Sequence, residues 1–280
     1  MNKSCIVLAA NFLVFSLASF SQQDSLNTSL RKKPSVKLGI FGVSKLNYYG
    51  RTDSLKSSGF FPILEVWVNK NFYISAAPVF VYNNALSPYY GGTVTTAGVL
   101  VRNKKWSSNN YISLPVYRQN SGLVQQRLKL QATAGISRIT KVITINGSAD
   151  IRYSGKLDYT AAAGLDHVFR IQAKDLVIAI DPTTTVNAGT QQFNATSYKQ
   201  SGLPLLPPVQ QKVEERVRRF SLLSYEFSAP LVVAKGRFQF IIVPAYVIPQ
   251  NIITVEGRPD LSERGENMFY FTAGVKGKLF

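Results

Sequence analysis

Cysteine, histidine and long apolar runs are nearly absent from this chain of 280 residues, which has one cysteine and one histidine. Metal sites built from several Cys or His ligands are therefore excluded, and there is no Asp- and Asn-rich loop of the calcium-binding type. Beyond the amino-terminal segment, no stretch approaches the roughly 18 continuous apolar residues of a transmembrane helix. We expect no cofactor, no bound metal and no helical membrane span.

Residues 1–21 have the pattern of a secretory signal peptide. Lys3 supplies the positive charge, Ile6–Phe20 forms the apolar core, and small residues precede a cleavage site ahead of Gln22. The core spans about 15 residues, fewer than the roughly 20 that a membrane anchor needs. Cys5 precedes this core instead of following it, so a lipoprotein is excluded. We expect an exported mature chain without disulfides.

Acidic residues are also scarce. Without Lys3, 31 basic residues face 15 acidic ones, which leaves a net charge of +16. A basic protein attracts nucleic acid, anionic lipid or anionic solutes. Export, and the lack of a basic helix or a base-stacking module, disfavour nucleic acid. The partners we expect are membrane lipids, including lipopolysaccharide, while basic loops that only keep the protein soluble are the simpler interpretation.

The abundant residues are apolar, at 45%, and aromatic, at 12%, and they are spread through short alternating segments. Such alternation is typical of transmembrane β-strands. After a polar periplasmic arm over 22–34, we predict one domain over 35–280, a closed antiparallel transmembrane β-barrel of about twelve strands. The strands are expected at 35–48, 58–69, 71–83, 93–102, 109–118, 124–135, 139–150, 157–170, 175–189, 217–234, 237–249 and 267–280.

The predicted connections alternate in length, as the turns and loops of outer-membrane barrels do. The short ones are 69–71, 103–108, 172–174 and 234–237, and the long ones are 49–57, 84–92, 190–216 and 250–266. Asn146-Gly147 is a hairpin signal inside the ambiguous region 136–157, so ten or fourteen strands remain alternatives. A soluble sandwich would show the same periodicity, and the alternation of the connections argues against it.

The polar face of these strands predicts the side chains that line the lumen. In one strand, Tyr225 and Phe227 alternate with Ser224 and Glu226, and Leu223 continues the apolar face. The charged residues expected to point inward are Glu65, Arg127, Lys129, Asp166, Asp181 and Glu226. They either pair into a structural network or line a pathway for small polar solutes. The loop 190–216 is the candidate plug or recognition element. The alternative is that the alternating run before Phe220 extends its strand above the membrane.

Aromatic residues are expected at the two membrane interfaces. Trp67 and Trp106 fall at the periplasmic ends of their strands. Tyr48, Tyr49, Tyr89 and Tyr90 fall at the outer ends.

The last strand resembles the final strand of bacterial outer-membrane barrels, which ends on Phe and is recognised by the barrel-assembly machinery. Other segments resemble a family of outer-membrane β-barrels common in Bacteroidota, mostly without assigned function: Asp175–Pro182, Asn187–Phe193, Val243–Asn251 and Tyr111–Val116. The resemblance implies the outer membrane of a Gram-negative bacterium, both termini in the periplasm, and Phe280 as the assembly signal. One feature departs from the pattern, because Phe280 alternates with Val275 and Leu279 and shares the face of Lys276 and Lys278. Either a bulge near Gly277 corrects the phase or Phe280 lies beyond the last pair.

Catalysis would have to pass through His167, the single histidine. Neighbouring residues of a strand point to opposite faces, so Asp166 and His167 cannot form a dyad without a bulge. His167 is expected to face lipid in the periplasmic half as a packing residue. We therefore expect no enzymatic activity and no catalytic residues. The leading hypothesis is a small porin-like passage for polar or anionic solutes, the alternative is a structural or interaction barrel with a salt-bridged lumen, and a lipid hydrolase comes third.

Overall fold

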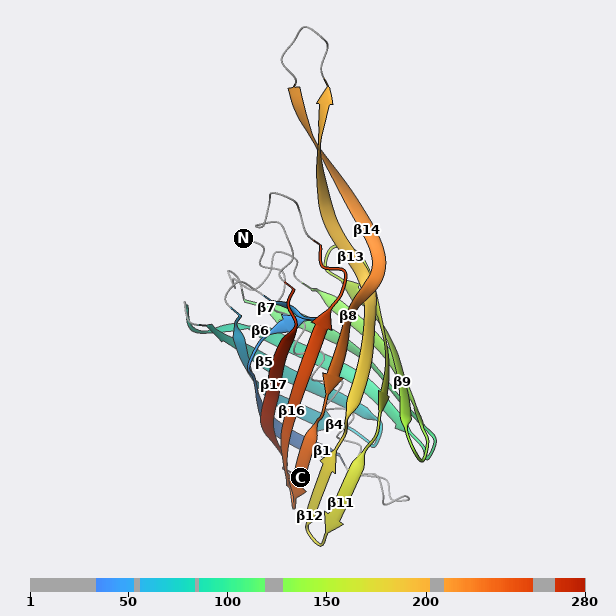
Figure 1. Ribbon diagram of the computed structural model, residues 1–280. Helices are drawn as coiled ribbons and strands as arrows, with labels where there is room; N and C mark the ends of the chain where they lie inside the picture. Colours follow the sequence, from blue (N-terminus) through green and yellow to red (C-terminus); the bar gives the residue numbers. More distant parts are fainter. Residues whose placement is uncertain are drawn as a thin grey trace.

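The computed structural model describes residues 34–52, 56–83, 86–118, 128–201, 209–253 and 265–279. Its main element is one antiparallel sheet whose last pairing, between β16 (Phe238–Pro249) and β17 (Met268–Lys278), closes it into a barrel (Figure 1). The wall continues through β1 (Ser35–Val43), β4 (Ser58–Trp67), β5 (Phe72–Asn83), β6 (Leu86–Arg102), β7 (Trp106–Tyr117), β8 (Leu130–Ile139), β9 (Thr144–Tyr153) and β10 (Leu157–Asp166).

Three strands of the wall are interrupted once each. The interruptions separate β10 from β11 (Phe169–Ala173), β12 (Leu176–Ile180) from β13 (Thr183–Ser201), and β14 (Val209–Ser228) from β15 (Leu231–Lys235). Two of the breaks contain Pro182 and Pro230, which have no backbone N–H to donate to a ladder. Their carbonyls still accept bonds from His167 N, at 3.3 Å, and Asp181 N, at 3.0 Å. When each interrupted pair is counted as one continuous strand, the barrel has twelve strands and is closed. This confirms the predicted fold class.

Short turns gather at one end of the barrel, which we call the short-turn end. They join β4 to β5, β6 to β7, β8 to β9, β11 to β12 and β15 to β16, and the described chain also ends there (Figure 1). Side chains stabilise two of them: Asn69 Oδ1 accepts from Phe72 N at 2.8 Å, and Asn103 Oδ1 accepts from Trp106 N at 2.7 Å. The inward-folded and longer connections lie at the opposite end, which we call the long-loop end, together with the short turn 154–156 between β9 and β10.

Three strands differ from their predicted positions. β6 begins at Leu86, not at 93, so most of the predicted long connection 84–92 belongs to the strand. The segments expected at 124–135 and 139–150 are β8 (Leu130–Ile139) and β9 (Thr144–Tyr153). Asn146-Gly147 lies inside β9, where Asn146 pairs with Ser137 and Gly147 with Ile136. The turn forms instead at 140–143, because the hydroxyl of Thr140 accepts a hydrogen bond from Ile143 N at 3.1 Å.

The predicted plug over 190–216 is an extension of the wall. β13 and β14 continue their ladder as far as the pair Ser201–Val209, and the resulting hairpin rises beyond the long-loop end (Figure 1). The intervening 202–208 lie outside the described residues. A bulge between Asn187 and Ala188 shifts the register, so Leu223, expected to face lipid, is 1% exposed.

The outer surface of the wall is apolar. Ile40, Ile112 and Phe240 are each about half exposed, and the same holds on every side of the barrel for residues such as Leu38, Leu64, Leu114, Ile136, Ile151, Leu165, Phe227, Ile242, Phe269 and Phe271. A water-soluble protein does not leave so continuous an apolar surface exposed. Among the described residues, no helix is long and apolar enough to cross a membrane.

The interior is divided into an apolar and a polar part. On the side of β1, β4, β5, β15 and β16, buried side chains form one cluster: Phe41, Val43, Leu46, Phe61, Ile63, Ala77, Val81, Val232, Ile241 and Val243. Glycine allows this packing on β17, since a Cβ on Gly274 would meet the ring of Phe41. The opposite wall is polar and carries the candidate site.

Candidate functional site: a lumen occupied by an inward-folded loop

The described part of the connection between β1 and β4, residues 44–52 with 56 and 57, folds against the inner wall of the barrel. It contains a small hairpin of β2 (Asn47–Tyr48) and β3 (Arg51–Thr52). The positive φ angles of Tyr49, 52°, and Gly50, 79°, suit the two-residue turn of a tight hairpin. Sequence analysis placed Tyr48 and Tyr49 at the outer membrane interface, but Tyr49 is 6% exposed inside the barrel. We call these described residues, 44–52 with 56 and 57, the inner loop.

Arg51 fastens the inner loop to the far wall. Its guanidinium donates to the carbonyl of Leu223 at 3.2 Å and to that of Gln250 at 2.9 Å, and the side chain is 3% exposed. A bridge between Arg51 and Gly265 adds a backbone contact. By contrast, the ion pair of Lys56 with Glu266, 2.7 Å long, is about half exposed and contributes little.

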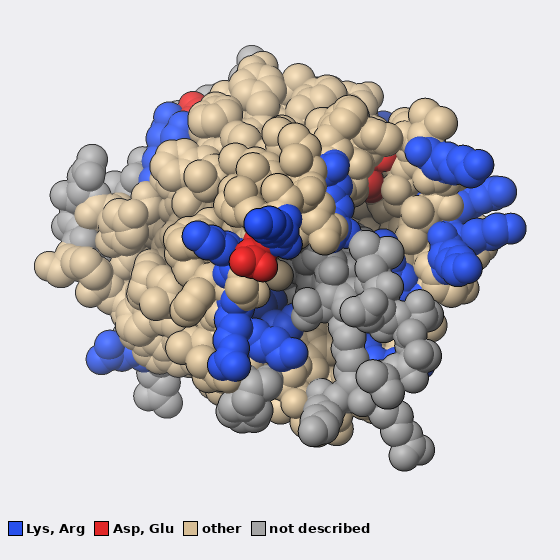
Figure 2. Space-filling view, turned by 90° about the horizontal axis from the view of Figure 1, so that it is seen from below, with Lys and Arg blue, Asp and Glu red and all other residues tan. Residues whose placement is uncertain are grey.

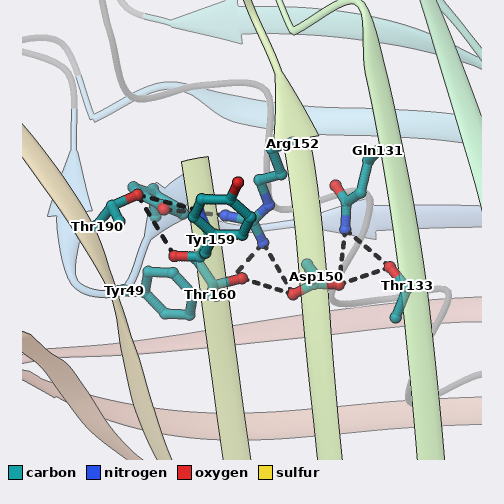
Figure 3. A network of polar contacts seen from close by, with 9 residues as sticks. Tyr49, Gln131, Thr133, Asp150, Arg152, Tyr159, Thr160 and Thr190 are labelled. Carbon is teal, nitrogen blue, oxygen red and sulfur yellow. Dashed lines mark hydrogen bonds and ion pairs between the residues drawn. The ribbon is translucent and has the colours of Figure 1, made fainter. Parts of the chain in front are cut away.

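A network of hydrogen bonds on β8, β9 and β10 faces the inner loop (Figure 3). Its centre is the carboxylate of Asp150, which accepts from the hydroxyl of Thr133 at 2.5 Å and from that of Thr160 at 2.6 Å. The amide of Gln131 donates to it at 3.1 Å, and the guanidinium of Arg152 lies 3.4 Å away. Four donors surround this half-buried carboxylate and hold it in place.

Arg152 connects this network to the inner loop. Its guanidinium donates to the hydroxyl of Tyr48 at 2.9 Å and to that of Tyr49 at 3.4 Å, and it lies over the ring of Tyr48 with 5.6 Å to the centroid. The burial of Tyr48 raises the pKa of its hydroxyl well above the ordinary value, so the hydroxyl stays neutral. Arg152 and the two tyrosines form the latch between loop and wall.

Glu65 is 9% exposed and pairs with Lys276 across β1, with 2.5 Å between Oε1 and Nζ. The indole N–H of Trp67 donates to the other carboxylate oxygen at 3.1 Å. Trp67 therefore faces the lumen at the short-turn end of the barrel, not the lipid interface predicted for it. Trp106 is 43% exposed on the outer surface of the short-turn end.

The other predicted lumen residues differ in their surroundings. Asp181 and Glu226 are both 8% exposed, and Glu226 accepts from the hydroxyl of Tyr270 at 3.1 Å. Asp166 is half-buried and accepts from the amide of Asn146. Lys129, expected to point inward, is exposed at the long-loop end with Nζ 5.8 Å from the ring centroid of Tyr153, because β8 starts only at Leu130. Arg127 lies outside the described residues.

Sequence reasoning missed Asp150, Arg152, Lys276 and the inner loop. Asp150 and Arg152 alternate with Ile151 and Tyr153, which is a clear signal, but the misplaced strand boundaries hid it. The partners of Lys276 and Arg152 are distant in sequence, so no local pattern identifies them.

Several buried polar atoms on the polar wall have no hydrogen-bond partner in the protein. Among the described residues they include Gln131 Oε1, Arg152 Nε, Asp181 Oδ1 and Asn187 Oδ1. Leaving such atoms unsatisfied costs about 1–3 kcal/mol each, so buried polar groups of this kind are normally met by water. The polar wall therefore presents groups that water can satisfy, in contrast with the apolar wall across from it.

His167 lies at the break between β10 and β11. Its Nδ1 meets the carbonyl of Val142, and its ring contacts Phe169 edge-on at 4.4 Å between centroids. Asp166 bonds to Asn146 instead. Among the described residues, no group of three or more His, Asp or Glu side chains could hold a metal ion.

The last strand keeps an unbroken register. β17 pairs with β1 from Val43–Thr272 to Lys37–Lys278 without a shift, so the bulge considered near Gly277 does not form within these pairs. Val275 and Leu279 face outward, 39% and 50% exposed, and Lys276 faces inward. Phe280 itself lies outside the described residues.

No protein family matches the sequence, and no curated protein matches it. Solved structures of outer-membrane barrels match the fold. An outer membrane channel from Pseudomonas putida F1 has a TM-score of 0.46 at 10% identity, covering 90% of this chain and 97% of the channel. LpxR from Salmonella typhimurium has a TM-score of 0.41 at 10% identity, covering 86% and 99%. An anion-selective porin from Comamonas acidovorans has a TM-score of 0.26 at 6% identity, covering 89% and 99%. Likeness at this level carries no argument about function.

Proposed function

We propose that this protein is an outer-membrane β-barrel with a narrow, porin-like passage for small polar or anionic solutes, constricted by the inner loop. A membrane location is supported by the closed ladder and the apolar outer surface, since hydrocarbon tolerates a sheet only when no edge is left unpaired. The secretory pattern of residues 1–21 and the resemblance to Bacteroidota barrels support the same location, with the short-turn end and both termini in the periplasm.

The observation that carries the passage is the polar inner wall. Ser75, Thr96, Asn109, Ser113, Gln131, Thr133, Thr160, Asn187 and Ser224 are all buried on neighbouring strands of one side. Thr96 and Ser113 share a hydrogen bond of 2.9 Å, and the unsatisfied atoms of Gln131 and Asn187 require water. A barrel that only filled its interior for stability would gain more from apolar side chains there.

The inner loop sets the width of this passage. It carries one cation, Arg51, and contacts a second, Arg152 of β9, which lies beside one carboxylate, Asp150. This excess of positive charge favours small anions over cations of the same size. The second candidate, a closed structural barrel, is favoured by the burial of the loop against the apolar cluster through Leu46.

Conductance in planar bilayers tests the proposal. The wild-type protein should give small, weakly anion-selective conductance steps. A variant whose hairpin residues 47–52 are replaced by a short Gly-Ser linker should give larger steps. If folded barrels of both forms carry no current, the protein is a closed barrel and the passage is refuted. Folding is verified by the shift in gel mobility between unboiled and boiled samples.

A further inference from the structure

Exposed positive charge is concentrated at the short-turn end. The exposed basic residues there are Lys70, Arg102, Lys104, Lys105, Arg138, Lys141, Arg170, Lys174, Lys235, Arg237 and Lys278. Among the described residues of this end, Asp175 is the single exposed acidic one. Figure 2, which looks onto this end, shows blue side chains spread over the face with few red ones.

The densest group lies on two neighbouring turns, 103–105 and 140–143. Ile139 N donates to the carbonyl of Lys105 at 2.7 Å, and Trp106 pairs with Arg138 across the two strands. The two turns hold three cations, and Arg138 at the end of β8 adds a fourth to the same surface. We call Lys104, Lys105, Arg138 and Lys141, together with Trp106, the two-turn patch.

The patch borders the apolar outer surface directly. The guanidinium of Arg138 lies over the outward-facing ring of Trp106, with 5.6 Å to the centroid. Around it, Val101, Ile136, Val142 and Ile145 are 50%, 53%, 75% and 49% exposed. Cations that lie just beyond apolar side chains, beside an interfacial Trp, mark the level of lipid headgroups.

We propose that the two-turn patch binds the phosphate group of an anionic phospholipid at the edge of the barrel. The fork of Arg138 matches two phosphate oxygens, and the lysines on the two turns add point charges around the same group. Trp106 and Val142 contact the glycerol and the first part of the acyl chains. A soluble anion could bind the lysines equally well, but it would make no use of the apolar side chains of Trp106 and Val142 beside them.

The patch offers a direct optical test through Trp106. In a Trp67→Phe background, Trp106 alone reports on neighbouring lipid, and phosphatidylglycerol with brominated acyl chains quenches it. The protein is reconstituted in phosphatidylcholine vesicles that contain either this lipid or brominated phosphatidylcholine. We expect stronger quenching by brominated phosphatidylglycerol.

The test variant combines Lys105→Gln with Arg138→Gln, and the matched control combines Lys129→Gln with Lys156→Gln. The control removes the same charge at the long-loop end, where Lys129 also lies over an outward-facing ring, that of Tyr153. The preference for phosphatidylglycerol should fall by about fivefold per removed cation, or about 25-fold for the pair, and should not change in the control. Equal losses in both variants would reduce the effect to net charge and overturn the site.

Two further outcomes overturn the proposal. The first is equal quenching of the wild-type patch by both lipids. The second is displacement of the lipid by inorganic phosphate at low millimolar concentration, which would show an anion site without lipid specificity. If Trp67→Phe does not fold, the test and control variants are made in the chain that retains Trp67. Native mass spectrometry then compares how much phosphatidylglycerol co-purifies with each variant.

Discussion

Replacement of Arg152 by Met should loosen the inner loop without unfolding the barrel. The substitution keeps the length of the side chain and removes three interactions: hydrogen bonds to the hydroxyls of Tyr48 and Tyr49, at 2.9 and 3.4 Å, and the ion pair with Asp150 at 3.4 Å. Asp150 keeps its hydrogen bonds from Gln131, Thr133 and Thr160, so its carboxylate is not left without donors. The loss therefore falls mainly on the contact between loop and wall.

Hydrogen bonds to a charged group contribute about 1.5–3 kcal/mol each. The short bond to Tyr48 dominates, because the one to Tyr49 is long. At roughly 1.4 kcal/mol per tenfold change, the population of barrels with the loop displaced should rise roughly tenfold to a hundredfold. In single-channel recordings this increase appears as more frequent openings to a larger conductance.

The matched control is Lys156→Met, an exposed cation at the same end of the barrel. Tyr48→Phe removes only the hydroxyl that accepts from Arg152, so it should reproduce most of the effect, and the double variant should add little to it. The reasoning is refuted if protease digestion shows the loop released in Arg152→Met while the conductance stays at the wild-type level. Full additivity of the two substitutions would show that the latch does not act as one unit.

Three further predictions concern stability and pH. Lys276→Met leaves Glu65 charged and buried, so the folded form should lose about 3–5 kcal/mol in urea titrations followed by gel mobility, and adding Glu65→Leu should restore most of it. Gly98→Leu should destabilise the barrel by about 1–3 kcal/mol, because a Cβ there would lie 2.5 Å from Cζ of Tyr73; Tyr73→Ala in the same chain should relieve the loss. The raised pKa of Tyr48 means that the unfolded chain releases this proton first. Stability should therefore be constant below the ordinary value of about 10 and fall as the pH rises above it, and Tyr48→Phe should show a shallower alkaline decline.

Much of the wall could be predicted because its signals are local. A period of two, interrupted by Asn and Gly turns, locates a strand whatever its neighbours are. The errors fall where two local signals competed. Asn146-Gly147 suggested a hairpin, yet a turn held by the Thr140 hydroxyl forms nearby and Asn146-Gly147 remains in the ladder. Residues 190–216 were interpreted first as a loop, and the alternating run before Phe220 suggested the alternative of a longer strand. The ladder of β13 and β14, which continues to the pair Ser201–Val209, confirms the alternative.

The candidate site was less predictable. Inward-facing charges follow from alternation, and Glu65, Asp181 and Glu226 are indeed buried. Alternation does not predict which long connection folds into the barrel. That depends on the hydrogen-bond partners that each connection can reach inside the lumen. The inner loop contacts Arg152 and the carbonyls of Leu223 and Gln250, whereas the β13–β14 segment satisfies its own backbone in a two-stranded ladder.

The amino-acid sequence by itself determines a chain of alternating strands with turns between them, and thus a closed barrel with an apolar outer surface. Only the tertiary structure decides that Lys276 faces Glu65, 211 residues away, and that Arg152 faces Tyr48, 104 residues away. The reason is geometric. The stagger of the strands, and a bulge such as the one beside Ala188, set which inward side chains meet across the barrel. Periodicity along one strand contains no information about that stagger.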